Sequence, residues 1–315
     1  MIKTNMVTIN GILNLEKPYG MTSMETLRRL KRASSQKKVG HTGTLDPIAT
    51  GVIPVCFGKA TRLAEDIMLN EKEYLVDIRL GLTTDTYDAL GKTIAEKLPS
   101  NISLKNIEDA LSSFQGEIFQ VPPMFSALKH KGVRLYNLAR SGLEIPREPR
   151  KVFVYSIELI DFSSPIIQLK IRCSKGFYVR SLANDLGEIL GCGAVMNGLV
   201  RTKSGPFNIE DAIPLDEAEE KFRMKEFQDI LIPLDTAVSH LPFVNVTYEQ
   251  AKDLSHGKLI YSKENSIVYT DQNHSERLRA YDPNGQFVGI VQNQQDLGGF
   301  KPEKIFYSSP QTRNL

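Results

Sequence analysis

The order of strand-like and helix-like segments constrains the fold of this 315-residue chain most strongly. Several strand-like segments follow one another across short turns, with amphipathic helices interleaved among them. A parallel βαβ fold needs a long crossover, usually a helix, between successive strands. The pattern therefore predicts an α+β fold in which a mixed, largely antiparallel sheet is flanked by helices.

The expected elements are distributed over the first two thirds of the chain. Alternating or continuous apolar patterns predict strands at 11–17, 52–58, 72–81, 151–162 and 166–182. Helical periodicity predicts helices at 22–35, 59–69, 103–115 and 181–190. The first helix has a capping-box signature, because Thr22 is followed three residues later by Glu25.

A change in pattern near residues 233–245 predicts a boundary between two domains, 1–235 and 240–315. Beyond it, a short helix precedes strand-like pieces at 266–270, 277–282, 286–292 and 304–309. The "DPNG" sequence at 282–285 is typical of a hairpin turn. We therefore expect a small C-terminal module that resembles a β-barrel.

The composition limits where in the cell the protein can be expected and which kinds of site it can contain. No apolar stretch reaches the roughly 18–20 residues that a membrane helix needs, and the N-terminus lacks the pattern of a secretory signal, which favours a cytoplasmic protein. Cys56, Cys173 and Cys192 form no C-x-x-C pair, so a disulfide framework is not expected. The histidines are not at metal-ligand spacing, so no metal site is predicted.

Basic residues are concentrated in two segments of a chain whose net charge is only +2. Residues 1–64 carry ten Lys or Arg and three Asp or Glu, a local charge of +7. Residues 129–151 carry seven and two, a local charge of +5. Each cluster alone could be a solvated surface, but together they favour a face that binds a polyanion.

The segment "VGHTGTLDPIATG" at 39–51 contains a single carboxylate, Asp46, among three glycines and a proline. Asp is common in such loops because its side chain binds nearby backbone amides. A catalytic role is the alternative. The segment matches neither a Walker loop nor a dinucleotide-binding fingerprint, and it offers no second carboxylate for glycosidase chemistry.

A longer segment, "GHTGTLDPIATGVIPVCFGKATRL" at 40–63, resembles the active-site motif of the bacterial pseudouridine synthases that modify the T-arm loop of transfer RNA, the TruB family. Four further segments resemble blocks of that family in the family's order: 13–23, 72–91, 121–142 and 173–190. The resemblance covers most of residues 10–210. It implies an isomerase that converts uridine to pseudouridine without a metal, redox cofactor or energy source.

The resemblance also implies roles for individual residues. Asp46 would be the catalytic aspartate, acting either as a nucleophile toward the ribose or as a base that removes a ribose proton. Arg180 would pair with Asp46 and keep it ionised. Tyr74 would stack on the uracil and handle the proton at C5, although a strand tyrosine more often serves packing.

Other matching positions concern substrate binding. Tyr178 and Leu199 match residues that line the pocket around the base, and His41 matches one that helps to extract the target from its loop. The target uridine would be flipped out of the T-arm, at a cost of about a few kcal/mol in unstacking. Transfer RNA is then the expected partner of the basic faces, with no membrane, no obligate protein partner and a monomer as the default.

Candidates for contact with the RNA backbone are Lys17, Arg28, Arg29 and Lys129. One expected phosphate contact is missing, because Val200 stands where the family often has Arg, while Leu199 and Arg201 are retained. The C-terminal module is similar, more weakly, to the small RNA-binding PUA domain.

Two other functions compete with the isomerase. A non-catalytic RNA-binding or RNA-folding protein of the same fold would not require Asp46, Tyr74 and Arg180 together. A phosphate-handling hydrolase would use the glycine-rich loop, but the sequence lacks the metal-ligand cluster and the phosphate-binding Lys that it needs.

Overall fold

Residues 8–261 and 276–307 are described by the structure, a computed structural model. In these ranges the large sheet contains ten strands, and eight of them follow the order β14-β1-β3-β12-β4-β11-β10-β7. The two remaining strands, β2 and β13, pair with β3 and β12. The strands are β1 (Gly11–Lys17), β2 (Val39–His41), β3 (Ala49–Phe57), β4 (Lys72–Leu80), β7 (Gly116–Gln120), β10 (Arg150–Ser163), β11 (Ile166–Cys173), β12 (Ala194–Ser204), β13 (Phe207–Asn208) and β14 (Ile213–Pro214).

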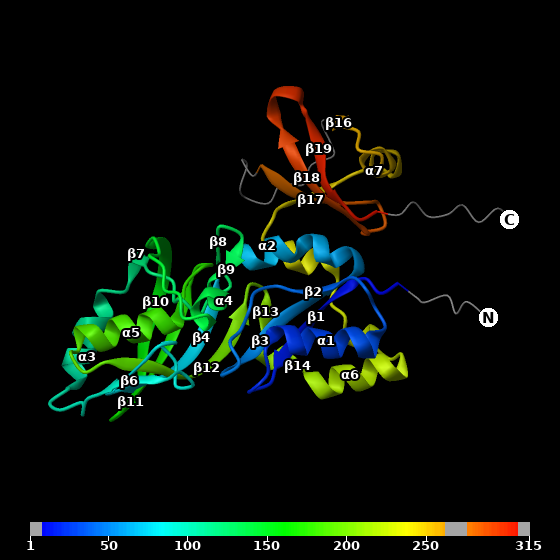
Figure 1. The fold of residues 1–315 in the computed structure, drawn as a ribbon. Coiled ribbons are helices and arrows are strands. Elements are labelled where there is room, and N and C mark those ends of the chain that lie inside the picture. The colour runs from blue at the N-terminus through cyan, green and yellow to red at the C-terminus, as the bar shows by residue number, and fades with distance from the viewer. Residues whose placement is uncertain (1–7, 262–275, 308–315) are drawn as a thin grey trace.

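The predicted fold class is confirmed. Only the β1–β14 and β3–β12 pairs of the large sheet are parallel, and its other pairs are antiparallel. The helices lie against this sheet in two groups (Figure 1). Near β1 and β14 lie α1 (Ser23–Ser34) and α6 (Leu215–Met224), and near β4, β10 and β12 lie α3 (Leu104–Ser112) and α5 (Val179–Ile189).

Local sequence signals account for the helix ends. The capping box predicted at Thr22 and Glu25 is present, with the Thr22 hydroxyl accepting from the Glu25 amide at 3.1 Å. Leu27 and Leu30 face the core. The helix predicted at 59–69 is in fact divided: Gly58–Leu63 forms a 3₁₀ turn, and only α2 (Ala64–Leu69) is α-helical.

The strand predicted at 166–182 is too long. β11 ends at Cys173, Gly176 has φ +84°, and α5 begins at Val179. The Tyr178 amide donates to the Gln120 side chain at 2.7 Å, and the Gln120 amide group donates back to the Tyr178 carbonyl at 2.9 Å. This clamp starts the helix and places Arg180 in its first turn.

Two small hairpins extend from the large sheet. One consists of β5 (Leu82–Thr84) and β6 (Thr93–Glu96). The other consists of β8 (Lys129–His130) and β9 (Val133–Arg134) and is followed by α4 (Leu135–Arg140). This second hairpin and α4 carry part of the basic segment 129–151.

The C-terminal region forms a separate, curled five-stranded sheet in the order β15-β17-β18-β19-β16, next to α7 (Tyr248–Ser255). Its strands are β15 (Phe243–Asn245), β16 (Ile260–Tyr261), β17 (Arg277–Tyr281), β18 (Phe287–Gln294) and β19 (Gly299–Ile305). The "DPNG" turn connects β17 to β18, with Gly285 at φ +75°. The strand expected at 266–270 lies outside the described residues.

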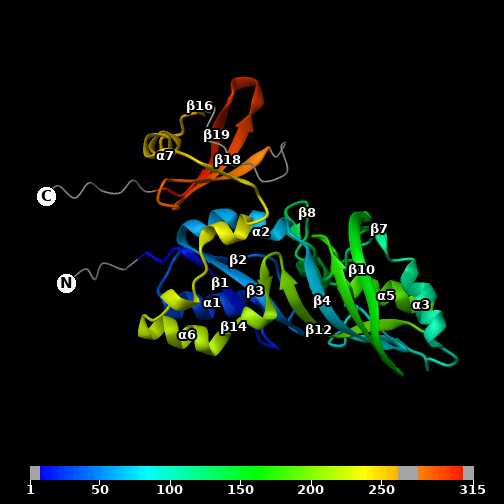
Figure 2. The same ribbon diagram turned by 180° about the vertical axis from the view of Figure 1, so that it is seen from behind.

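The two sheets meet across α2, which lies between them in Figures 1 and 2. A shared apolar cluster joins them, and its buried members include Ile12, Val52 and Cys56 from the large sheet and Ile290 from the small one. Asp66 of α2, which is 4% exposed, accepts from Arg277 and Lys304 of the small sheet, each at 2.7 Å. Packing and a buried ion cluster therefore both hold the small sheet in place.

Candidate active site

Asp46 lies in the loop 42–48, between β2 and β3. Hydrogen bonds with the turn that follows β1 and with the first residue of α1 hold this loop. The Gly20 amide donates to the Pro47 carbonyl at 2.8 Å, and the Ser23 hydroxyl both donates to the Leu45 carbonyl at 3.0 Å and accepts from its amide at 2.9 Å. The position of the carboxylate is thus fixed by the start of α1.

Asp46 and Arg180 form a two-point ion pair, although 134 positions separate them in the sequence. Nη2 of Arg180 lies 3.0 Å from Oδ1 and Nε lies 2.9 Å from Oδ2. The guanidinium also donates to the carbonyls of Thr86 at 3.2 Å and Phe125 at 2.8 Å, and Nη1 lies 3.8 Å from Oδ2 of Asp88. Three segments of the chain, around residues 46, 86–88 and 125, therefore fix the direction of the guanidinium.

Burial and charge act in opposite directions on the Asp46 carboxyl. Burial raises its pKa above the ordinary value, Arg180 lowers it, and the nearby Asp88 raises it. The net shift of the pKa is upward. The Asp46 side chain is still 32% exposed, whereas that of Arg180 is 6% exposed. The result is a carboxylate that is held by a buried guanidinium and open on one side.

Tyr74 on β4 pairs in register with Arg201 on β12, and Val76 pairs with Leu199 two residues earlier on β12. Side chains two residues apart on a strand point to the same face, so Tyr74 and Leu199 share one face of the sheet. Tyr74 packs against the core cluster that contains Leu45 and Leu199. Burial raises the pKa of the Tyr74 hydroxyl to about 12.

Family models match two adjacent segments. "TruB family pseudouridylate synthase (N terminal domain)" matches residues 31–179, and "tRNA pseudouridylate synthase B C-terminal domain" matches residues 180–239. Curated proteins named tRNA pseudouridine synthase B are similar along nearly the whole chain. One from Dehalococcoides mccartyi strain BAV1 is 43% identical over 95% of this chain and 97% of its own length. One from Clostridium tetani is 41% identical over 94% and 99%.

The chain belongs to the TruB family of pseudouridylate synthases.

Solved structures of the same fold agree with this membership. A Cbf5-Nop10-Gar1 complex contains a chain that superposes with a TM-score of 0.74 and 26% identity, covering 95% of this chain and 85% of that one. An H/ACA RNP bound to a substrate RNA containing 2′-deoxyuridine gives a TM-score of 0.73 and 25% identity, covering 95% and 86%.

Two other predicted substrate-binding residues of this TruB-family chain adjoin the ion-pair residues in the sequence. Tyr178 is half-buried at the start of α5, two residues before Arg180, and burial raises the pKa of its hydroxyl. His41 ends β2, directly before the loop that carries Asp46, and burial and the Arg201 charge lower its pKa. Sequence analysis missed Asp88, whose only signal is its position in the block at 72–91.

Four residues were expected to contact the RNA backbone, and two of them, Lys17 and Arg29, are engaged inside the protein instead. Arg28 and Lys129 are exposed. Lys17, however, is fully buried, and its ammonium donates to the carbonyls of Pro18 at 2.7 Å and Met21 at 2.6 Å. Burial lowers its pKa to about 8. It stabilises the turn before α1 and is not a surface contact.

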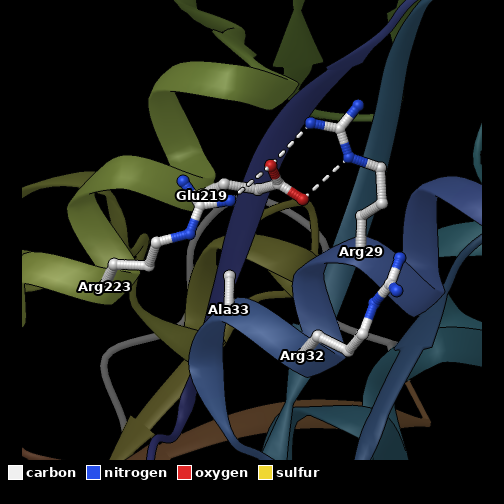
Figure 3. A pocket seen from close by; sticks show the side chains of 5 residues that line it. All are labelled: Arg29, Arg32, Ala33, Glu219 and Arg223. Carbon is white, nitrogen blue, oxygen red and sulfur yellow. Dashed lines mark hydrogen bonds and ion pairs between the residues drawn. The ribbon is translucent and has the colours of Figure 1, made fainter.

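Arg29 is also engaged within the protein. Its guanidinium donates to both carboxylate oxygens of Glu219 at 2.8 and 2.6 Å and to Asp216 at 2.6 Å. Figure 3 shows Arg29 on α1 directed at Glu219 on α6, in a hollow of about 400 Å³ that Arg32, Ala33 and Arg223 also line. Arg29 therefore joins two helices, and its charge is neutralised there.

Within residues 8–261 and 276–307, no group of three or more His, Cys, Asp or Glu side chains is arranged to hold a metal ion. None of the helices in the same ranges is long and apolar enough to cross a membrane.

Proposed function

We propose that this TruB-family enzyme isomerises one specific uridine in the T-arm loop of transfer RNA to pseudouridine, with Asp46 acting on a nucleotide flipped out of the loop. The observation that carries the proposal is the two-point pair between Asp46 and Arg180, in which one side of the carboxylate stays open. The curated relatives named tRNA pseudouridine synthase B support transfer RNA as the substrate.

The atoms of this reaction balance within the nucleotide. The bond between N1 of uracil and C1′ of ribose breaks, a bond between C5 and C1′ forms, and one hydrogen leaves C5 while one is gained at N1. Asp46 acts first, as a nucleophile at C1′ or as a base on a ribose proton, and both routes need its ionised form. Arg180 favours that form and aims the carboxylate.

We assign the later proton transfer and the binding of the base to the residues around the pair. Tyr74 lies on the face of the sheet that carries Leu199, where its ring can stack on uracil and its hydroxyl can relay the C5 proton, giving up its own proton as it takes that one. Tyr178 and Leu199 enclose the base. His41, beside the Asp46 loop, supports the extruded conformation of the RNA.

The outer surface would orient the RNA. Arg28 and Lys129 are exposed and suit phosphate contacts, and so do Lys131, Arg134 and Arg140 of the basic segment 129–151. We further propose the division into a catalytic domain, 1–235, and a PUA-like RNA-binding domain, 240–315, in agreement with the two separate sheets. The protein would act as a cytoplasmic monomer.

One assay tests the proposal. Purified protein is incubated with an unmodified T-arm stem-loop, without added cofactor, and pseudouridine is mapped in the product. We expect a single modified position, no product from Asp46→Asn, and RNA binding by that variant within a few-fold of wild type. Normal turnover by Asp46→Asn would remove Asp46 from its role. Binding without any product from wild type would favour the non-catalytic RNA-binding alternative.

A further inference from the structure

One row of paired residues crosses the large sheet beneath the Asp46 loop. Lys17 on β1 pairs with Gly51 on β3, Gly51 pairs with Arg201 on β12, and Arg201 pairs with Tyr74 on β4. Paired residues direct their side chains to the same face of a sheet. The row therefore places the Arg201 guanidinium next to the ring of Tyr74, on the side of the sheet where Asp46 lies.

Arg201 is 2% exposed and every contact of its guanidinium is made inside the protein. Nε donates to the Val52 carbonyl at 2.7 Å and Nη2 donates to the Gly43 carbonyl at 3.3 Å. The Tyr74 hydroxyl is its other hydrogen-bond partner. Gly43 belongs to the loop that carries Asp46, so one side chain connects that loop, β3 and Tyr74.

No carboxylate of the described residues forms an ion pair with Arg201. A buried charge without an opposite charge costs several kcal/mol, and apolar residues of similar size often pack at no such cost. Packing alone therefore does not account for an arginine at this position. Its presence is explained by a role in hydrogen bonding or in electrostatic stabilisation.

The hydrogen bond to Tyr74 has a fixed direction. A guanidinium has only N–H donors, so the Tyr74 oxygen must accept from Arg201 and its own proton must point elsewhere. The positive charge also favours the deprotonated phenol and opposes burial, which raises the pKa of Tyr74 to about 12. The other titratable groups that act on this hydroxyl are Asp46 from the loop and Cys173 from β11.

We propose that Arg201 is a positioning residue for the isomerisation, which holds the Tyr74 oxygen and the loop of Asp46 in a single arrangement. The inference rests on the proposed function, because that function gives the Tyr74 oxygen its part in removing the C5 proton. Arg201 does not itself touch the substrate in this account. Its effect passes through Tyr74 and the Gly43 carbonyl.

Single-turnover rates on the T-arm stem-loop test this role. Arg201→Met should lower the rate about 100-fold, as a displacement of about 1 Å in an active site can, while RNA affinity stays within about threefold. Arg201→Lys, which keeps the charge, should recover part of the loss.

Arg79→Met is the matched control, because Arg79 is exposed on the opposite face of β4. In a Tyr74→Phe background, Arg201→Met should lower the rate several-fold less than it does in wild type, because only the backbone contacts of Arg201, including that with Gly43, then remain to be lost. An equal loss in both backgrounds would show that Arg201 acts independently of Tyr74 and would overturn the inference.

A second readout does not need turnover. In protein labelled with ¹³C at the tyrosine ζ carbon, the Tyr74 signal is assigned by its loss in Tyr74→Phe. Arg201→Met, or Arg201→Gln if the Met variant does not fold, should move this signal, and Arg79→Met should leave it in place. An unmoved signal would refute the contact. Absence of pseudouridine from wild type would instead refute the proposed function and leave the spectroscopic result standing.

Discussion

The ionisation of Asp46 decides the chemistry of the proposed reaction. Both routes begin from the carboxylate, yet burial raises the pKa of this group and only Arg180, with a smaller effect of Lys17, opposes the rise. The two-point geometry makes Arg180 more than a counter-ion, since it also sets the direction of the carboxylate oxygens. Loss of the guanidinium would therefore change both the ionisation of Asp46 and the direction of its oxygens.

We therefore expect Arg180→Met to lower the single-turnover rate at pH 7.5 by about 100-fold, from the loss of a charged, two-point hydrogen bond worth about 3 kcal/mol. The acid limb of the pH–rate profile should also move to higher pH, because without Arg180 only the smaller effect of Lys17 opposes the rise in the pKa of Asp46. Rates between pH 5 and 9 measure this. Arg172→Met, on the exposed side of β11, is the control, and an acid limb that stays in place would contradict the explanation.

The family resemblance of the sequence predicted Asp46, Tyr74 and Arg180 as catalytic residues, and the structure brings Asp46 and Arg180 into contact. The positions of Lys17 and Arg29 could not be predicted in the same way. Lys17 is buried because of its register in β1, and Arg29 is neutralised by Glu219, which lies 190 positions away. Counting charges along the sequence identifies basic segments. Whether each basic side chain is exposed depends on contacts with residues far away in the sequence, which such a count does not reveal.

The parallel contact between β3 and β12 joins the two halves of the large sheet at Gly51. This residue has φ +96°, and a Cβ there would lie 2.4 Å from the Arg201 carbonyl oxygen. Any other residue would push apart the strands that carry the Asp46 loop and Arg201. The sequence shows a glycine after the loop, but its steric reason comes from a strand 150 residues later.

Gly51→Ala should consequently lower the free energy of unfolding by about 3 kcal/mol or more, from the strained backbone and the overlap with β12. Urea denaturation followed by circular dichroism measures the change. Gly191→Ala is the matched control, because Gly191 also has positive φ, +71°, but a Cβ there meets nothing within 4 Å. It should cost only about 1–2 kcal/mol. Equal losses in the two variants would rule out the steric contact.

The strand pattern gave the fold class and most element positions, and the errors fall at element ends. The segment at 173–182 looked β-rich because Phe177, Tyr178 and Val179 are strand-favouring residues. Contacts with Gln120 of β7 turn it into the start of α5 instead. Tertiary contacts overrode local propensity at the point where Arg180 must be placed.

The association of the two sheets depends on Asp66, which binds cations of β17 and β19. Asp66→Ala would remove the carboxylate that binds the partly buried Lys304 and one of the two that bind Arg277, which keeps Glu303, so we expect a loss of about 3 kcal/mol in unfolding free energy. It should also speed proteolytic cleavage between the sheets, near residue 240. Glu65→Ala, one position away and exposed, should change neither. Unchanged cleavage in Asp66→Ala would show that apolar packing alone holds the small sheet.

Affinity for the T-arm stem-loop should fall steeply with salt, because each phosphate neutralised contributes roughly 0.7–0.9 to the slope of log affinity against log salt. Lys129→Met and Arg28→Met should each reduce that slope by about one contact. Arg29→Met should leave it unchanged, since Glu219 and Asp216 already neutralise Arg29. Fluorescence anisotropy at several salt concentrations tests this, and a flat response in wild type would argue against phosphate recognition.

The wide separation of Asp46, Arg180 and Arg201 along the chain has a consequence for biosynthesis. During translation, the aspartate emerges from the ribosome early, while its guanidinium partner is synthesised 134 residues later. A growing polypeptide thus holds a loop without this counter-charge until Arg180, a little more than halfway along the 315-residue sequence, has been made. If the proposed mechanism holds, nascent chains and truncated products that lack Arg180 do not modify RNA.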